Sequence, residues 1–300
     1  MMQQSLDKMV SIYCPQAHVR LVLANVTDTS KTLERNHLCG PIAGVVQAEF
    51  VGGMALLGTL LSAPGERISL RVDLPNGLLG GALLECAYGH TIRGYMRRKV
   101  LPDLDDSTAP SEELFDRAIG RSAHCGIIRS DAHGGKTDAV FDLNFKDRLT
   151  VTDIIEEYFC TSLQRRALVQ LSAASKQNYV ACSHALLCDF LPEASEETYR
   201  KIEQRFASGE VQDALDRGLS IQEFIEFFQL DTPPTAAEEM PVKFACHCSS
   251  DRVIAMLRSL PKEDLIEMIN QGRASDIYCH MCGKGFSITV EQLKALVDEK

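Results

Sequence analysis

Hydrophobic and polar positions in the first two thirds of the chain predict a mixture of strands and helices. In RISLRVDL (67–74) apolar residues alternate with charged or polar ones before the turn PNG, which is typical of a half-buried strand. SAHCGIIRSDAHGGKTDAVFDLNF (122–145) predicts two further strands joined around HGGK, and TVTDIIEEYFCTSL (150–163) predicts a helix that opens at a threonine or aspartate cap. Strands and helices do not alternate regularly, so the pattern favours an α+β fold over a doubly wound sheet.

A longer apolar segment lies between Glu49 and Glu66. Its 16 uncharged residues include four glycines and a proline. A helix that crosses a membrane needs about 20 apolar residues. The segment therefore predicts a buried helix and no membrane span.

Two amphipathic helices are predicted after Pro192, because apolar residues recur there at helical spacing. The first helix carries Tyr199, Ile202 and Phe206, and the second carries Ile221, Phe224, Ile225 and Phe228. DTPPTAAEEMP (231–241) contains three prolines and no apolar pattern, which predicts a linker. We therefore divide the chain into a core domain of residues 1–191, a helical connector of residues 192–241 and a small C-terminal module of residues 242–300.

The connector carries most of the negative charge. The whole chain has a net charge of −10, and residues 192–241 hold 4 basic and 12 acidic side chains, a net charge of −8. Self-repulsion and limited apolar burial predict helices that are only marginally stable when docked on the core. The alternative is an acidic helical pair that is permanently docked. Because nucleic acid binding depends on lysine and arginine, the overall charge argues against a nucleic acid partner.

The chain contains 11 cysteines and begins without a basic segment followed by an apolar run. These features predict a cytoplasmic protein whose cysteines are thiols or metal ligands. Seven cysteines show no metal-ligand spacing, and we expect them to be buried or half-buried core thiols. They are Cys14, Cys39, Cys86, Cys125, Cys160, Cys182 and Cys188.

The other four cysteines form two close pairs. Cys246-His-Cys248 and Cys279-His-Met-Cys282 are separated by 30 residues. Zn²⁺ takes four soft ligands in a tetrahedron, and two such pairs are its usual signature. The four sulfurs are therefore the predicted ligands of one zinc ion.

Other residues near the pairs are assigned supporting roles. Gly283 and Gly285 are expected to let the backbone turn tightly behind the second pair. His247 and His280 lie inside the pairs, but each pair already supplies two thiolates. Both histidines are therefore expected to face outward.

A zinc ion held by four thiolates has no open position for water or substrate, so Lewis-acid catalysis is not expected. The site is then structural, reactive at sulfur, or both. Zinc-bound thiolates are already deprotonated, and a Cys246–Cys248 disulfide would close a small, strained ring. Cys279 and Cys282 have the spacing of redox-active dithiols.

Two further functions stay open at this point. A thiol-disulfide oxidoreductase would use Cys279 and Cys282, although the glycines after Cys282 favour a metal knuckle over a helix N-terminus. A constitutive adaptor would use the zinc module to bind a protein partner. We find no catalytic constellation: GGKT (134–137) lacks the first glycine of a phosphate loop and is expected in a hairpin turn.

Loss of the metal is expected to unfold the C-terminal module. A module of about 59 residues has little core of its own, so metal binding supplies much of its folding free energy. Oxidation of the thiolates should therefore unfold residues 242–285. If the connector packs against that module, it would undock when the module unfolds and expose its apolar faces.

Three stretches resemble the 33 kDa chaperonin family, the redox-regulated heat-shock holdases. Residues 246–286 resemble the family's C-x-C and C-x-x-C segment with its intervening gap. GHTIRGY (89–95) is similar to a family G-x-x-R-G-Y stretch, and YFCTSLQ (158–164) to its Y-F-x-x-S-x-Q stretch. The mass of 33.1 kDa also agrees.

The resemblance implies an ATP-independent chaperone and not an enzyme. Reduced Cys246, Cys248, Cys279 and Cys282 would hold one Zn²⁺, and oxidation would form Cys246–Cys248 and Cys279–Cys282 disulfides and release zinc. The oxidised protein would form a homodimer and bind unfolding clients, which prevents their aggregation under oxidative stress. The apolar connector face that we expect the switch to expose comprises Tyr199, Ile202, Phe206, Ile221, Phe224, Ile225 and Phe228.

Overall fold

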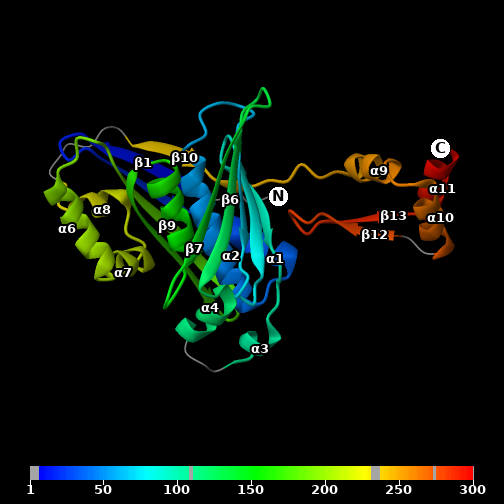
Figure 1. The fold of residues 1–300 in the computed structure, drawn as a ribbon, viewed down its shortest axis with the longest axis horizontal. Coiled ribbons are helices and arrows are strands. Elements are labelled where there is room, and N and C mark those ends of the chain that lie inside the picture. Colours follow the sequence, from blue (N-terminus) through cyan, green and yellow to red (C-terminus); the bar gives the residue numbers. More distant parts are fainter. Residues whose placement is uncertain (1–6, 108–110, 231–236, 273–274, 300) are drawn as a thin grey trace. The chain divides into compact units, whose positions relative to one another are not determined.

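The computed structural model describes residues 7–107, 111–230, 237–272 and 275–299. The chain forms two compact units, Met1–Phe244 and Ala245–Lys300. Both units combine helices with antiparallel strands (Figure 1). The α+β fold class predicted from the sequence is confirmed.

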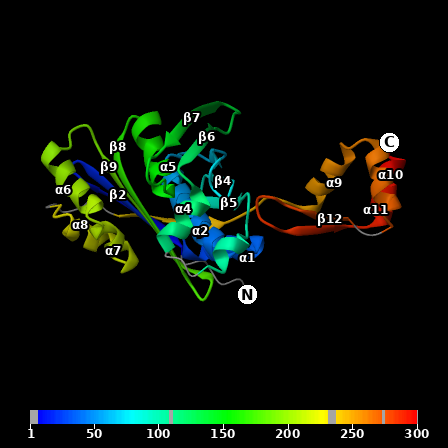
Figure 2. The same cartoon turned by 60° about the horizontal axis from the view of Figure 1, so that its bottom comes forward.

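The first unit contains a five-stranded antiparallel sheet with the strand order β10-β1-β2-β9-β8. Its strands are β1 (Lys8–Cys14), β2 (Val19–Asn25), β8 (Arg166–Lys176), β9 (Tyr179–Phe190) and β10 (Glu238–Pro241). Buried apolar side chains project from both faces of this sheet. Helix α2 (Pro41–Gly58) packs on one face and a later group of helices covers the other (Figure 2).

A six-stranded sheet has the order β11-β5-β4-β3-β6-β7, in which only β11 runs parallel to its neighbour among the described strands. Its strands are β3 (Arg67–Asp73), β4 (Gly81–Ala87), β5 (Thr91–Met96), β6 (Ser122–Ser130), β7 (Lys136–Asn144) and β11 (Lys243–Phe244). Burial alternates along β3, and β6 pairs with β7 across the HGGK turn. The three strands and the hairpin turn predicted in this region are confirmed.

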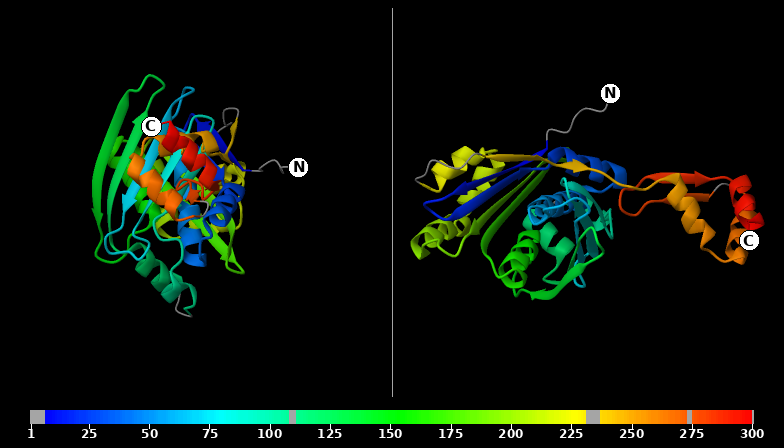
Figure 3. Two further views of the ribbon diagram at one scale, coloured as in Figure 1. Left: turned by 90° about the vertical axis from the view of Figure 1, so that its right-hand side faces the viewer. Right: turned by 90° about the horizontal axis from the view of Figure 1, so that it is seen from above.

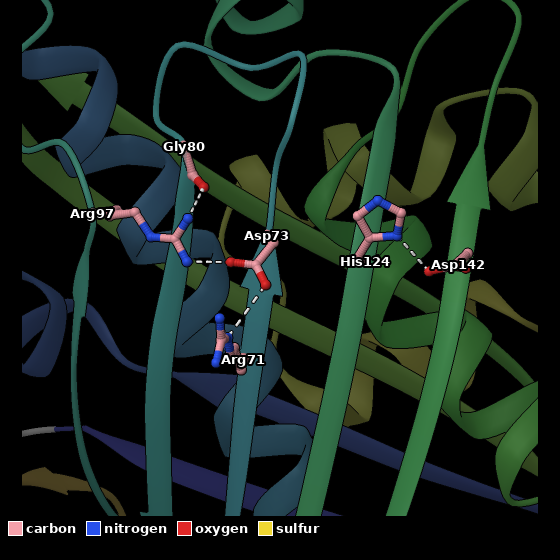
Figure 4. Close-up of polar contacts among 6 residues, drawn as sticks. All are labelled: Arg71, Asp73, Gly80, Arg97, His124 and Asp142. Atoms are coloured by element: carbon pink, nitrogen blue, oxygen red, sulfur yellow. Dashed lines mark hydrogen bonds and ion pairs between the residues drawn. The ribbon is translucent and has the colours of Figure 1, made fainter.

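One face of the six-stranded sheet is exposed and carries charged side chains that pair with one another (Figure 4). Arg71 and Arg97 both pair with Asp73, Arg71 with its Nε 3.3 Å from Asp73 Oδ2. On the next two strands His124 Nδ1 lies 2.6 Å from Asp142 Oδ1. These pairs place charge on the exposed face, which also carries the exposed apolar side chains of Ile128 and Val140, while the opposite face joins the core around α2.

Helix α2 is the central element of the larger core. It has 18 residues and would pass as a membrane span by length and composition, but 89% of this stretch is buried inside the protein. Gly53 allows close packing, because a Cβ atom there would lie 2.6 Å from Ile155 Cγ1. The predicted buried helix is confirmed, but its bounds differ from those of the uncharged segment. It runs from Pro41 to Gly58, so Glu49 lies within the helix and not before its start.

Glu49 places a carboxyl group in this apolar helix. Burial raises its pKa from 4.5 to about 7, and Arg148 only partly opposes this effect. The folded protein then holds the proton more tightly than the unfolded chain, so this group lowers stability as the pH rises from about 4.5 through about 7. We expect Glu49→Gln to stabilise the protein by about 1–3 kcal/mol near pH 8 and to flatten the pH dependence. Thermal unfolding across this pH range measures the effect, and an unchanged profile in the variant would contradict it.

The remaining helices before residue 192 are short. They are α1 (Thr27–His37), α3 (Pro102–Asp105), α4 (Ser111–Ile119) and α5 (Val151–Glu157), which continues into a π-helical turn, η1 (Tyr158–Ser162). At the start of α5 the Asp153 N–H donates to Thr150 Oγ1 at 3.2 Å, and the Thr150 N–H donates to the Asp153 carboxylate at 2.7 Å. This capping box confirms the helix start predicted at a threonine.

Three helices follow β9, namely α6 (Glu196–Ala207), α7 (Glu210–Asp216) and α8 (Ile221–Phe227). The hydrophobic pattern predicts only two. Helix α7 offers only Val211, Ala214 and Leu215 as apolar residues, and it lacks the aromatic side chains that mark the faces of the other two helices. The prediction of two helices is therefore wrong by one.

Residues after α8 return to the sheets. β10 pairs with β1, where Lys8 Nζ lies 2.9 Å from Glu239 Oε1, and β11 pairs with β5. The predicted linker is thus wrong for Glu238–Pro241, and residues 231–236 lie outside the described residues. The edge of β1 offers backbone donors and acceptors, and pairing with it does not require the apolar pattern from which strands are predicted.

The second unit is small. It contains α9 (Ser250–Arg258), α10 (Lys262–Asn270) and α11 (Val290–Asp298), together with a hairpin of β12 (Ser275–Tyr278) and β13 (Gly285–Ile288) (Figure 3, right). Among its described residues the buried core comprises Leu257, Leu265, Ile288, Leu293 and Leu296. A core of this size gives a fold little stability of its own.

Candidate metal centre and docking face

The four paired cysteines lie on two segments of the second unit. Cys246 and Cys248 precede α9, whose first turn is capped by Ser249 Oγ. Cys279 and Cys282 lie in the turn that joins β12 to β13. Segments about 30 residues apart in sequence thus meet at one end of the hairpin.

Backbone hydrogen bonds shape the turn that carries the second pair. The Gly283 N–H donates to the Cys279 carbonyl oxygen at 2.8 Å, and the Cys279 N–H donates to the Lys284 carbonyl oxygen at 2.9 Å. Gly283 has a φ of 72°, which glycine adopts readily. Gly285 does not turn the backbone as expected: it begins β13, where a Cβ atom would lie 3.0 Å from Tyr278 Cε1.

The four sulfur atoms all lie within 4.8 Å of one another. The Sγ atoms of Cys246 and Cys279 are 3.9 Å apart, and those of Cys248 and Cys282 are 3.3 Å apart. In a tetrahedral site with Zn–S bonds of about 2.3 Å, the sulfurs are about 3.8 Å from one another. The four side chains therefore fit a single tetrahedral cation of this size.

The electrostatics of the cluster also favour a cation. Cys282 is only 3% exposed, and the other three cysteines are half-buried. Burial raises the pKa of both the Cys248 and the Cys282 thiols, and neighbouring sulfurs add to this effect. Four adjacent thiolates would repel one another, so a bound cation is what would keep them deprotonated together. His247 and His280 are exposed and do not belong to this group.

The seven scattered cysteines occupy several environments. Cys14, Cys86, Cys125 and Cys188 are buried, and Cys39 and Cys182 are half-buried, as expected. Cys160 is exposed, so the prediction of a buried or half-buried thiol is wrong there. The cause is the π-helical turn η1, which places Tyr158 and Phe159 in the core and turns the next residues outward.

The second candidate functional feature is an apolar surface on the five-stranded sheet, which we call the docking face. It comprises Ile12, Cys14, Val19, Leu21, Leu168, Leu186, Cys188 and Phe190. Helices α6, α7 and α8 cover it (Figures 1 and 2). Four of the seven predicted apolar connector residues are buried in this interface, namely Ile202, Phe224, Ile225 and Phe228. The other three are partly exposed and pack against it, namely Tyr199, Phe206 and Ile221.

Polar contacts between α7 and β8 reinforce the apolar interface. Ser172 Oγ donates to the Asp216 carboxylate. Next to this pair, Gln170 Nε2 donates to Gln212 Oε1 at 2.6 Å. The outward sides of the helices carry exposed acidic residues, including Glu203 and Glu226, so the helices present apolar side chains to the sheet and negative charge to solvent.

Arg166 of β8 ties α6 to the sheet. Its guanidinium lies 2.7 Å from the Glu196 carboxylate and stacks 3.5 Å from the centre of the Tyr199 ring. We expect Arg166→Ala to weaken docking of α6 by about 1–2 kcal/mol, because both the cation–π contact and the ion pair are lost.

Amide hydrogen exchange in α6 measures this effect, and Arg200→Ala is the matched control. Arg200 also pairs with Glu196, at 3.2 Å, but it lies within α6 itself and is largely exposed. Its loss should cost only about 0.3–0.5 kcal/mol. Equal exchange rates in the two variants would show that Arg166 does not hold the helix on the sheet.

Comparisons with known proteins agree with this architecture. The sequence model that describes the Hsp33 protein family matches residues 7–289 of this chain. A 33 kDa chaperonin of Lachnoclostridium phytofermentans is 23% identical over 97% of this chain and 98% of its own length, and one of a Synechococcus species is 25% identical over 98% and 90%. The crystal structure of the 33 kDa chaperonin of Thermotoga maritima matches with a TM-score of 0.85 and 18% identity, over 98% of this chain and 99% of that one.

The fold and the cysteine cluster define a class: a chaperone with an α+β body and a C-terminal group of four cysteines that could hold a metal ion. Within this class the chain belongs to the Hsp33 family. The resemblance noted in the sequence is confirmed.

Proposed function

We propose that this protein is a redox-regulated, ATP-independent holdase that binds unfolding proteins once its four clustered cysteines are oxidised. The observation that carries the proposal is the convergence of four sulfurs within 4.8 Å in a unit with a very small core. Such a unit depends on its thiols for stability, so a change at sulfur becomes a change in folding. We place the protein in the cytoplasm, where thiols are kept reduced until oxidative stress.

In the reduced state Cys246, Cys248, Cys279 and Cys282 would hold one Zn²⁺. A bound zinc ion supplies positive charge that keeps thiolates deprotonated and joins the segment before α9 to the β12–β13 turn. The chain provides four sulfurs and leaves no ligand position for water, so the centre has a structural and redox role.

Oxidation by peroxide or hypochlorite would remove two electrons from each pair of thiolates, which join as a disulfide and release the metal ion. We infer that Cys246 bonds to Cys248 and Cys279 to Cys282, after which the chain no longer offers thiolate ligands. The two sulfur contacts described above, Cys246 with Cys279 at 3.9 Å and Cys248 with Cys282 at 3.3 Å, each join one pair to the other. Peptide mass mapping of the oxidised protein separates the proposed pairing from this crossed one.

The backbone next to the metal centre provides a route from the cysteines to the helices. Cys246 follows β11 after one intervening residue. The short strands β10 and β11 are held by backbone pairing, by the Lys8–Glu239 ion pair and by apolar contacts of Met240, Val242 and Phe244 with the core. Disorder in the second unit would reach these short strands first and then α8, which precedes them. Release of α6–α8 would uncover the docking face together with the apolar faces of the helices, and their acidic charge would keep the open protein soluble. We also propose that the open form dimerises.

The test is zinc release on treatment with peroxide or hypochlorite, followed in the same sample by suppression of aggregation of a thermally unfolding client. One equivalent of zinc released together with the onset of protection is the expected result. Equal client binding by reduced and oxidised protein would instead favour a constitutive adaptor. Substantial catalytic reduction of insulin disulfides would favour a thiol-disulfide oxidoreductase.

A further inference from the structure

Two cysteines outside the metal centre lie on the docking face. Cys14 on β1 and Cys188 on β9 have no exposed surface, and both belong to the apolar cluster that α6, α7 and α8 close. The two thiols are near enough for Cys14 to contribute to the raised pKa of Cys188. One apolar patch therefore contains two thiols, and the helices of the connector cover both.

These thiols cannot form a disulfide with each other without a large movement of the sheet. Strand β2 lies between β1 and β9, and two strand spacings of about 4.8 Å place the two Cα atoms about 9.6 Å apart or more. A disulfide needs Cα atoms within about 7 Å. Any covalent chemistry at these residues therefore needs an external partner.

Docked helices suppress that chemistry in two ways. They exclude reagents from Cys14 and Cys188, and burial raises the pKa of the Cys188 thiol well above its usual value. Because the thiolate is the nucleophile, almost none is present while the helices are docked. Exposure to water would return the pKa to about 8.5, at which a few per cent of the thiol is ionised near pH 7.

We propose that Cys14 and Cys188 form a cryptic modification site for small disulfides of the oxidised-glutathione class, which opens when α6–α8 leave the docking face. The Cys188 thiol loses its proton to water, its sulfur attacks one sulfur of the reagent, a mixed disulfide forms, and the other half of the reagent leaves as a thiolate. The added group has no room in a close-packed interface, so it prevents the helices from docking again. This inference rests on the proposed function, because it requires that the helices undock.

The first experiment compares labelling of Cys14 and Cys188 with that of Cys86 and Cys125. The latter are equally buried, but they lie in the larger core around α2, which α6–α8 do not cover. The full-length protein is treated with peroxide, exposed to oxidised glutathione or N-ethylmaleimide, and analysed by peptide mass spectrometry. We expect labelling of Cys14 and Cys188 to accelerate about 100-fold or more on oxidation while Cys86 and Cys125 stay protected.

Zinc release and client protection are measured in the same sample, which separates the two proposals. If zinc leaves and protection appears while Cys14 and Cys188 remain as slow as Cys86, the cryptic site is wrong and the redox switch stands. If oxidation has no effect on zinc, the switch fails, and labelling of the untreated protein decides the cryptic site. In the untreated protein Cys14 and Cys188 should react about tenfold faster than Cys86 and Cys125, because local opening costs less free energy than global unfolding. Equal labelling rates at the four cysteines would overturn the inference.

A second experiment tests whether modification holds the protein open. Oxidised protein is alkylated with N-ethylmaleimide, which does not react with disulfides, and is then reduced with dithiothreitol and supplied with zinc. Amide exchange in α6–α8 should stay fast in this protein. It should return to the protected state in a Cys14→Ala/Cys188→Ala variant treated identically, and equal protection in both would refute the proposed lock.

Discussion

Replacing Cys279 and Cys282 by serine is expected to give a protein that retains no stoichiometric zinc and no longer responds to oxidants. A serine hydroxyl stays protonated at neutral pH and is a poor zinc ligand, so two of the four ligands are lost. Binding of structural zinc contributes about 10–16 kcal/mol in small modules, and the second unit has only a small core to replace it. We therefore expect amide protection in α9, α10 and α11 to disappear and client protection to become the same with and without peroxide.

Two single substitutions serve as controls for this variant. Cys160→Ser makes the same chemical change at an exposed thiol outside the cluster, and it should leave zinc content and oxidant response intact. His280→Ala removes the exposed imidazole between the paired cysteines and should also retain zinc. A Cys279→Ser/Cys282→Ser protein that still bound one equivalent of zinc and still responded to peroxide would refute the assignment of these thiols.

Local patterns explain why much of the candidate site could be predicted from the sequence. The spacing of Cys246/Cys248 and Cys279/Cys282 identifies the four sulfurs, and the structure gathers them within 4.8 Å. The alternation in β3 and the capping box at Thr150 are likewise signals carried by neighbouring residues. Such features depend on short-range chemistry, which a single sequence contains in full.

Features that depend on distant partners could not be predicted in this way. Glu238–Pro241 forms a strand because it pairs with the edge of β1, and the residues of the segment itself do not indicate this pairing. We expect the apolar faces of α6 and α8 to be covered, but their partner is a surface assembled from β1, β2, β8 and β9, strands that bury side chains on both faces of the sheet and lie far apart in the sequence. Cys160 is exposed because the π-helical turn shifts the register of its neighbours.

A Phe224→Ala protein is expected to act as a chaperone without oxidation. Phe224 is fully buried between α8 and the docking face, and its ring stacks 5.9 Å from that of Phe228. Removing a buried phenylalanine side chain costs about 3–5 kcal/mol. The connector helices are acidic, short and only partly apolar, so a loss of this size should undock them while zinc remains bound. Client protection by the reduced protein, with zinc content measured in parallel, tests this expectation.

Phe50→Ala separates undocking from a general loss of stability. Phe50 is also fully buried, but it lies on α2 in the larger core. The same deletion there should lower the global melting temperature without selective exposure of the connector. Trypsin distinguishes the two outcomes, because its sites at Arg205 and Arg217 lie in or next to the connector helices: cleavage at these sites should accelerate in zinc-loaded Phe224→Ala and remain slow in Phe50→Ala at temperatures where both stay folded. Equal cleavage and equal client protection in the two variants would mean that general destabilisation, and not uncovering of the docking face, produces the active state.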